Sequence, residues 1–365
     1  MSKTLFGRRR DIFFLLAVLI LCISAFLLVF STRTRIKTSY YDIQLDAAMR
    51  MQKCIVFLRN YVAEAGIEIE EEDINGTGLI GPAYSELLTS LGHLESKRST
   101  LNPNMAALMV RLLHDAGLKK GSTVAIGSSG SFPAMAIATI CACNAMGLQD
   151  KTILSYGASN YGATRVELNI QRILDLLKKE GLISLNLLAV SPGSDNDYGI
   201  GTMEGILFDN TRDVVVGLGL SSGVEFIDLG NLAASIKRRM EIYGDIDAFV
   251  SIGGPSVNIG TSMEFLDVPP GLSMSLKSIP EGDTRGLVFE YAQRGVPVIN
   301  ILNIRGLCAD YGLPVDPMPL PGPGDGGVYY ETAYNTLLTV VSLVIILAVL
   351  GAGIVLSRRI RRTKP

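Results

Sequence analysis

Hydrophobic and polar positions divide the chain into two uncharged apolar runs and a long mixed segment between them. The runs cover residues 12–30 and 337–356. An α-helix rises about 1.5 Å per residue, so each run matches the roughly 30 Å hydrocarbon core of a bilayer. The pattern therefore predicts transmembrane helices at 12–30 and 337–356.

Basic residues flank the outer side of both runs. Lys3 and Arg8 to Arg10 precede the first run, and four arginines and Lys364 follow the second. Because positively charged ends stay cytoplasmic, we expect cytoplasmic basic tails at 1–11 and 357–365. Arg33, Arg35 and Lys37 weaken this bias after the first run. The prediction is a two-pass protein of the cytoplasmic membrane with an extracytoplasmic main domain.

A cleaved signal peptide is the alternative reading of the first run. The apolar region of a signal peptide has about 7 to 15 residues and ends at a small-x-small cleavage site. The run here is longer and ends in Leu-Leu-Val-Phe-Ser-Thr-Arg, without such a site. These features favour an uncleaved anchor.

Between the runs, short apolar segments alternate with segments of helical periodicity. Apolar strands that alternate with helices predict a mainly parallel sheet covered on both faces. The expected fold class is thus α/β, a layered sheet domain between two transmembrane helices. The predicted strands are 123–126, 153–155, 185–190, 248–252 and 296–302, and the predicted helices are 134–146, 164–179, 232–243 and 285–294.

The remaining segments suggest how the chain is organised around that domain. Residues 41–65 show an amphipathic helical period that suits either a membrane surface or, as we favour, packing on the domain. We expect a juxtamembrane helical region at 31–100, with an acidic loop at 68–73, and the α/β domain at 101–313. Repeated proline and glycine predict a semi-rigid linker at 314–336.

Charge and cysteine content limit the functional classes. The chain has 33 basic and 35 acidic residues, and the flanks of the two runs hold nine basic residues and Asp11, which leaves 24 and 34 between them, a formal charge of −10. This acidic balance disfavours nucleic acid as a partner. The five cysteines are scattered through apolar surroundings, which does not suggest a disulfide framework.

Four loops after predicted strands are rich in glycine and small polar residues, at 127–131, 157–162, 191–199 and 253–260. Ligands of open parallel sheets bind outside the carboxyl ends of the strands, where these loops lie. The alternative is that small residues merely turn the chain and cap helices. The candidate ligand-binding residues are Gly127, Ser128, Ser129, Gly130, Ser131, Ser159, Asn160, Gly253, Gly254, Ser256 and Asn258.

The first loop is the best candidate because it leads from a strand into a helix, where backbone N–H groups favour an anion. It is neither a P-loop nor a Gly-x-Gly-x-x-Gly turn. A serine hydrolase would use Ser128, Ser129 or Ser131, but the Gly-x-Ser-x-Gly elbow is not met. Both histidines of the chain, His93 and His114, precede the strands, which disfavours a Ser/His site.

Metal and cofactor chemistry have weak support in the sequence. Asp195 and Asp197 could share a hard cation with loop carbonyls, but their spacing completes no calcium loop. No dense Cys/His set suggests zinc. We therefore expect no metal and no cofactor.

Two stretches carry a resemblance to a known family. They are Asn-Pro-Asn-Met-Ala-Ala-Leu at 102–108 and Ala-Ile-Gly-Ser-Ser-Gly-Ser-Phe-Pro-Ala at 125–134, supported by residues 156–164 and 251–254. With these stretches the chain resembles the poly-gamma-glutamate system protein family. The resemblance implies a place in the making, export or anchoring of a gamma-linked glutamate polymer, beside the membrane-bound synthase subunits, and assigns no catalytic residue.

Two hypotheses follow from the resemblance. The first is a non-catalytic membrane accessory whose loops bind glutamyl carboxylates of the polymer or partner subunits. The second is an extracytoplasmic gamma-glutamyl hydrolase or transferase, with Ser129 or a neighbour as nucleophile and loop amides as the oxyanion site. We favour the accessory because no complete catalytic set is visible in the sequence.

Overall fold

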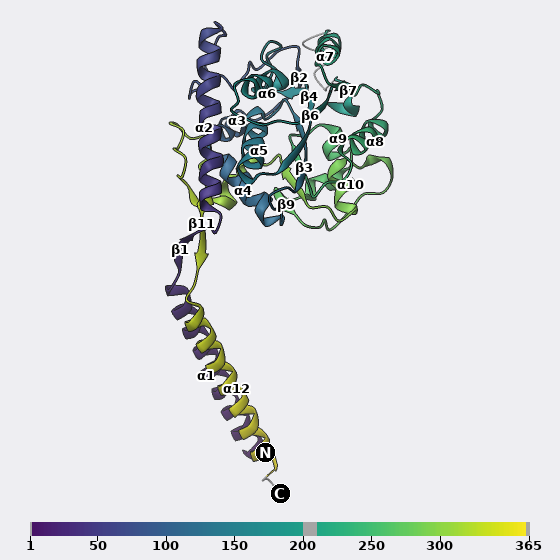
Figure 1. Cartoon of the computed structure of the whole chain (residues 1–365). Coiled ribbons are helices and arrows are strands. Elements are labelled where there is room, and N and C mark those ends of the chain that lie inside the picture. The colour runs from purple at the N-terminus through teal and green to yellow at the C-terminus, as the bar shows by residue number, and fades with distance from the viewer. Residues whose placement is uncertain (1, 200–209, 363–365) are drawn as a thin grey trace. The chain divides into compact units, whose positions relative to one another are not determined.

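The computed structural model describes residues 2–199 and 210–362 (Figure 1). Lys364 of the expected basic tail lies outside these residues. The chain forms two compact units, one from its two ends up to Ser39 and from Tyr330 onward, and one over Tyr40–Tyr329. Each is described by itself.

The first unit is a pair of long helices joined by a short strand pair. Strand β1 (Thr34–Lys37) follows helix α1 (Ser2–Ser31) and pairs antiparallel with β11 (Tyr330–Ala333), which precedes helix α12 (Thr336–Arg362). The two helices therefore run side by side in opposite directions (Figure 1).

Both helices contain a segment that is long and apolar enough to cross a membrane. These segments are Ile12–Ser31 and Thr336–Leu356, and very little of either is buried within the protein. They contact each other where Gly353 faces Phe14, since a Cβ atom on Gly353 would lie 2.1 Å from the Phe14 ring.

The second unit is a mixed α/β domain around a mainly parallel sheet of seven strands, as predicted. Its strand order is β7-β6-β4-β3-β8-β10-β9, and only β9 runs antiparallel to its neighbour. The strands are β3 (Thr123–Ser129), β4 (Gln149–Ser155), β6 (Leu187–Ser191), β7 (Glu225–Phe226), β8 (Ala248–Ile252), β9 (Gly271–Ser273) and β10 (Val298–Ile301). A second, two-stranded sheet pairs β2 (Leu88–Ser90) with β5 (Ala158–Ser159) in parallel.

Helices cover both faces of the large sheet (Figure 1). One face carries α4 (Asn104–Asp115), α5 (Pro133–Met146) and α6 (Ile170–Lys179), and the other carries α8 (Leu232–Tyr243), α9 (Ser256–Ile259) and α10 (Leu287–Gln293). Further helices are α3 (Leu94–Thr100), α7 (Thr211–Leu220) and α11 (Ile304–Tyr311), with short 3-10 turns at Asp195–Asp197, Met263–Asp267, Gly282–Thr284 and Gly327–Tyr329.

Helix α2 (Tyr41–Glu64) packs on the domain. Its amphipathic period had left two alternatives, contact with a membrane surface and packing on the domain, and the structure shows the second. Its apolar stripe contacts α4 and α5, and Met51, Cys54 and Leu58 are fully buried in it. This burial follows from the recurrence of apolar residues every three or four positions.

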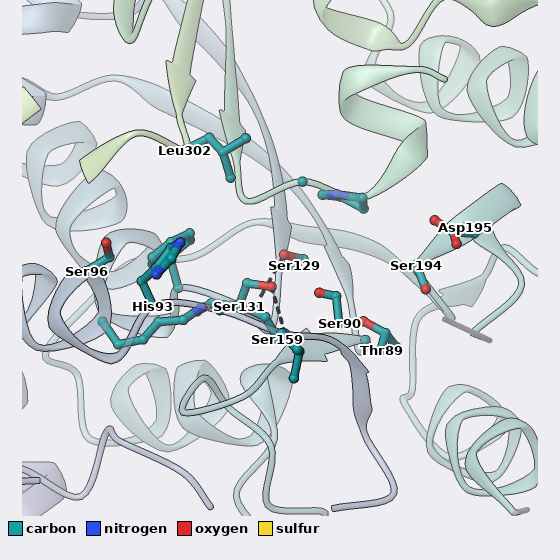
Figure 2. Close-up of a pocket in the computed structure, with 17 residues that line it drawn as sticks. Thr89, Ser90, His93, Ser96, Ser129, Ser131, Ser159, Ser194, Asp195 and Leu302 are labelled. Carbon is teal, nitrogen blue, oxygen red and sulfur yellow. Dashed lines mark hydrogen bonds between the residues drawn. The ribbon is translucent and has the colours of Figure 1, made fainter. Parts of the chain in front are cut away.

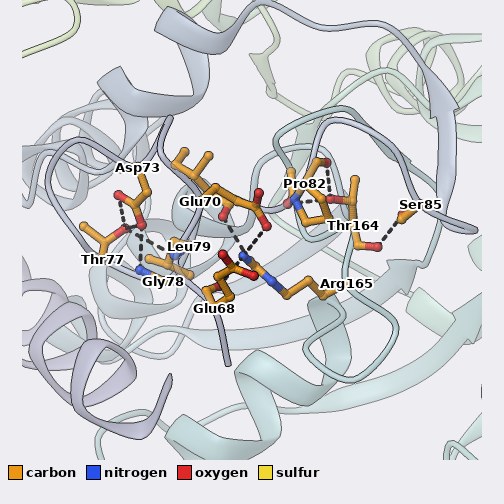
Figure 3. A network of polar contacts seen from close by, with 12 residues as sticks. Glu68, Glu70, Asp73, Thr77, Gly78, Leu79, Pro82, Ser85, Thr164 and Arg165 are labelled. Carbon is orange, nitrogen blue, oxygen red and sulfur yellow. Dashed lines mark hydrogen bonds and ion pairs between the residues drawn. The ribbon is translucent and has the colours of Figure 1, made fainter. Parts of the chain in front are cut away.

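The segment after α2 is held to the loop that follows β5 by buried polar contacts (Figure 3). The Arg165 guanidinium donates to the carbonyl oxygens of Ile80 and Glu68 and pairs with the Glu70 carboxylate at 2.6 Å. The Asp73 carboxylate accepts from the Gly78 N–H at 2.7 Å. Only part of the acidic stretch is therefore a solvated loop, because Asp73 is buried.

The proline-rich segment lies against the α/β domain through polar contacts. The Asn104 side chain donates to the Gly322 carbonyl at 2.9 Å and accepts from the Gly324 N–H at 3.0 Å, and Arg98 pairs with Asp316. The compact unit thus contains residues from the expected juxtamembrane region as well as most of the expected linker.

The predicted elements differ from the observed ones mainly at their ends. Strand β3 continues through Ser129, because Gly127 and Ser128 pair with β4 and β8, so placing these residues in a loop was wrong. Helix α6 starts only at Ile170, where the Asn169 side chain caps it by accepting from the Arg172 N–H at 3.0 Å. Strands β7 and β9 are two and three residues long, too short for a periodic signal.

Candidate functional site

A pocket of about 310 Å³ opens at the carboxyl edge of the large sheet (Figure 2). Its lining comes from the segments that follow five strands, together with residues around β2 and α3. The strand-following residues are Ser131 and Phe132 after β3, Gly157 after β4, Ser194 and Asp195 after β6, Gly254 and Pro255 after β8, and Leu302 after β10. Ser129, at the end of β3, and Ser159, in β5, also line the pocket.

The pocket lies where the winding of the sheet reverses. From β3 the chain moves outward through β4 and β6 on one side, and then returns to β8 and β10 on the other. The loops after β3 and β8 consequently leave the sheet on opposite faces, which opens a crevice between them. Doubly wound sheets bind ligands at this switch point.

Four of the predicted ligand-binding residues line the pocket, namely Ser129, Ser131, Ser159 and Gly254. Ser129, Ser131 and Ser159 lie close together in Figure 2, at the middle of the pocket floor. The Ser131 hydroxyl accepts from the Ser159 N–H at 3.0 Å, which joins the loop after β3 to the β5 strand. With Ser194 and Asp195, the pocket lining brings together residues from all four predicted loops.

Two predicted residues in β3 lie within the sheet and make internal contacts. The Ser128 hydroxyl donates to the Ser129 carbonyl at 3.2 Å. The Asn258 side chain donates to the Gly127 carbonyl at 2.8 Å, and a Cβ atom on Gly127 would lie 2.6 Å from that amide. Gly127 and Asn258 therefore connect β3 to α9, outside the pocket lining.

The other four predicted residues position the pocket loops without lining the pocket. The Gly130 N–H donates to the Ser155 and Gly157 carbonyls, and the Asn160 side chain accepts from the Gly92 N–H at 2.5 Å. The Ser256 N–H donates to the Ser194 carbonyl at 3.3 Å.

Gly253 has a φ of +82° and sits where a Cβ atom would lie 2.3 Å from the Ser129 hydroxyl oxygen. A side chain at Gly253 would push Ser129 away, so this glycine sets the shape of the pocket floor.

Asp195 and Asp197 are separated by the structure. Asp195 lines the pocket, whereas Asp197 is fully buried and pairs with Arg239 at 2.6 Å. The Asp197 carboxylate also accepts from the Ser191 hydroxyl at 2.8 Å and from the Gly193 N–H at 3.0 Å. Its oxygens are thus used to fix the loop after β6. The described residues contain no group of three or more His, Cys, Asp or Glu side chains that could hold a metal.

Lys97 is a pocket residue that the sequence pattern did not predict. It comes from α3, is only 2% exposed, and donates from Nζ to the Ser159 hydroxyl at 2.6 Å and to the Ser131 carbonyl. Its ammonium also lies 3.9 Å from the centre of the Phe132 ring. Burial lowers the pKa of Lys97 to about 7.

The two histidines differ in position, and their place before the strands in the chain did not show that one of them lines the pocket. His93 precedes the large sheet in the chain but lines the pocket (Figure 2). His114 packs against Tyr40, with ring centres 4.0 Å apart and ring planes tilted by 31°. Sequence order could not place His93, because the β2–β5 pairing brings residues 88–90 to the edge of the pocket.

The geometry defines the class of the domain as a doubly wound α/β fold with a polar, serine-rich pocket at its switch point. Comparison with models of protein families, with curated proteins and with solved structures found no match to this chain.

Proposed function

We propose that this protein is a two-pass membrane accessory of gamma-linked glutamate polymer production, whose α/β domain lies outside the cytoplasm and holds glutamyl carboxylates in the switch-point pocket. The resemblance through residues 102–108 and 125–134 is the reason for naming a gamma-linked glutamate polymer as the ligand. The pocket itself is the observation that carries the binding role.

The pocket suits a small polar acid. Ser129, Ser131, Ser90 and Thr89 line it with hydroxyl-bearing side chains, and Gly254 adds no side chain to the lining. Hydroxyl and backbone N–H donors hold carboxylates without a fixed cation. A volume of about 310 Å³ is at the lower end of ordinary ligand pockets and fits one or two glutamyl units rather than a folded partner.

The helix pair supports the two-pass topology. The antiparallel pairing of β1 with β11 places the far ends of α1 and α12 on the same side of the pair. Both apolar segments expose nearly all their side chains, as helices in lipid do. Basic residues at both far ends favour the cytoplasmic side for the termini.

The binding role is tested with the full chain in lipid nanodiscs. Titration calorimetry with a gamma-linked glutamate oligomer should give saturable binding, and an alpha-linked oligomer of equal length should bind at least about tenfold more weakly. Gly254→Leu should abolish binding, because the leucine side chain would fill the pocket. The fold should tolerate the substitution, since a Cβ atom at Gly254 meets only ordinary contacts at 3.7 and 3.8 Å.

Gly217→Leu is the matched control, since nothing lies within 4 Å of a Cβ atom at Gly217 on α7. Equal binding of both oligomers, or undiminished binding by Gly254→Leu, would refute the proposal. The topology is tested separately, with tags at both ends and protease added outside intact spheroplasts. Both tags should be protected while the domain is cut.

A further inference from the structure

We propose that Ser159 and Lys97 form a serine–lysine pair, in which the Ser159 hydroxyl is a nucleophile for acyl transfer and Lys97 is its general base. The inference goes beyond the proposed binding role and does not depend on which polymer or acid occupies the pocket. The proposed substrates are amides or esters of small acids, which are small enough to enter the pocket.

The contact between the two side chains has the geometry that proton transfer requires. Lys97 Nζ and Ser159 Oγ are 2.6 Å apart, within hydrogen-bond reach of a base and its nucleophile. Both side chains line the same pocket, so a substrate carbonyl can approach Oγ. In the ammonium form Nζ donates to Oγ, and in the neutral amine the same contact reverses, so that the hydroxyl donates to the nitrogen lone pair.

The position of Lys97 is fixed by its surroundings. Its Nζ donates to the Ser131 carbonyl as well, and its stem passes Gly92, where a Cβ atom would lie 3.2 Å from Lys97 Cε. Gly92 also keeps Ser159 Oγ accessible, since that same Cβ atom would lie 2.9 Å from it. A larger residue at position 92 would collide with Ser159 and crowd Lys97, so the close approach of these two side chains requires Gly92.

Burial supplies the unprotonated base. The pKa of Lys97 falls to about 7 because the ammonium loses its hydration, so a large share of the side chain is neutral at physiological pH. The other titratable groups that line the pocket are His93 and Asp195. Among the described ion pairs, none joins a carboxylate to Lys97. A carboxylate partner would stabilise the ammonium form and keep the side chain protonated.

We assign Ser159 as the nucleophile, and not Ser129 or Ser131, because its hydroxyl contacts Lys97 Nζ. The hydroxyl of Ser131 accepts from the Ser159 N–H, and that of Ser129 accepts from the Ser131 N–H at 3.4 Å. Ser159 is the serine whose hydroxyl contacts the Lys97 amine in the described hydrogen bonds. This assignment moves the candidate nucleophile from the loop after β3 to strand β5.

The reaction balances with the groups present and water. Ser159 Oγ attacks the carbonyl carbon while its proton passes to neutral Lys97 Nζ, and an Oγ–carbon bond forms. Collapse of the tetrahedral intermediate breaks the carbonyl–nitrogen bond, and Lys97 returns the proton to the leaving amine. Water, or an acceptor amine in a transfer reaction, then cleaves the ester, with Lys97 again relaying the proton.

A fluorophosphonate probe tests the pair directly in the full chain in nanodiscs. An activated Ser159 forms an Oγ–phosphorus bond and expels fluoride, and the adduct is located by peptide mass spectrometry. Labelling should fall at least about 100-fold in Ser159→Ala and in Lys97→Met. The labelling rate of the unaltered chain should rise with pH through a midpoint of about 7, which a merely structural lysine would not produce.

Two substitutions outside the pocket serve as matched controls. Ser235→Ala removes another buried serine, and Lys151→Met removes another lysine whose Nζ donates to backbone carbonyls, those of Tyr243 and Asp245. Both should label like the unaltered chain. Far-UV circular dichroism establishes that each variant is folded.

The outcomes separate this inference from the proposed binding role. An unlabelled chain, an adduct on another serine, or full labelling of Lys97→Met would overturn the serine–lysine pair. If the unaltered chain still bound the gamma-linked oligomer, the binding role would stand alone. Labelling of Ser159 without any oligomer binding would support the pair and reject the polymer.

Discussion

Lys97 gives the folded chain a measurable dependence of stability on pH. Its pKa falls from 10.5 to about 7 on folding, so between these values the unfolded chain binds a proton that the folded chain does not. The free energy of unfolding should therefore rise with pH in this window, by up to about 1.4 kcal/mol per unit. The gain in stability is complete above pH 10.5 and is lost progressively as the pH falls from there to about 7.

Urea unfolding of the full chain between pH 7 and pH 9, followed by circular dichroism, measures this slope. Lys97→Met should flatten it, since the side chain that titrates is gone. Lys151→Met is the control and should keep the slope of the unaltered chain, because that lysine is only half-buried. A slope that persists in Lys97→Met would assign the pH dependence to other groups.

The buried pair between Arg239 and Asp197 is a second sensitive point at the scale of the residue. Both side chains are at most 1% exposed, and Asp197 fixes the loop after β6. Asp197→Asn would leave the guanidinium buried without its counter-charge, which costs about 3–5 kcal/mol. Chemical unfolding should show this loss as an earlier midpoint.

The ion pair of Arg238 with Glu225 is the natural comparison, because it lies one residue away and is about 40% exposed. Glu225→Gln should change the free energy of unfolding by less than about 1 kcal/mol. Equal losses in the two variants would show that burial does not decide the strength of these pairs.

Part of the site could be predicted from sequence and part could not. Ser129, Ser131 and Gly254 were accessible to prediction because they lie at or just after the ends of buried strands, and the carboxyl ends of parallel strands meet at one edge. Lys97 gave no such signal, since Leu-Glu-Ser-Lys-Arg-Ser-Thr resembles an exposed polar turn of helix. Its burial depends on β2 pairing with β5, a contact between segments about seventy residues apart.

At the scale of the element, α2 carries a clear prediction. Leu58 is fully buried against the domain, so Leu58→Ala should lower the free energy of unfolding by about 2–5 kcal/mol. Val56 is 49% exposed on the opposite side of the same helix, and Val56→Ala should change it by less than about 0.5 kcal/mol. Thermal unfolding of the two variants distinguishes domain packing from membrane contact, for which Val56 would be the sensitive position.

The same scale explains why the fold was more predictable than the site. Five strands and four helices of the α/β domain follow from apolar runs and helical periods, and strand β8 and helix α8 have the predicted bounds. The ends of other elements depended on partners instead, as where pairing with β8 continues β3 through Ser128 and pairing with β4 continues it through Ser129. Residues that shape the pocket lie at these ends, where local pattern is least informative.

At the scale of the whole molecule, the acidic charge of the segment between the apolar helices opposes the approach of a polyanion. This segment has a formal charge of −10. Such repulsion acts over about 30 Å at an ionic strength of 0.01 M and over about 8 Å at 0.15 M. In the proposed function, the pocket would hold a single acid through short-range donors that salt screens little.

Salt should therefore affect a long polymer and a short ligand differently. Raising NaCl from about 10 mM to about 150 mM should increase the association rate of long poly-gamma-glutamate several-fold, because screening weakens the repulsion. The rate for a gamma-glutamyl dipeptide should change far less. Surface plasmon resonance with nanodisc-held protein measures both rates. A polymer rate that falls with salt would instead reveal a basic surface that draws the polyanion in, as in proteins that bind nucleic acids, and would shift the polymer site away from the switch-point pocket.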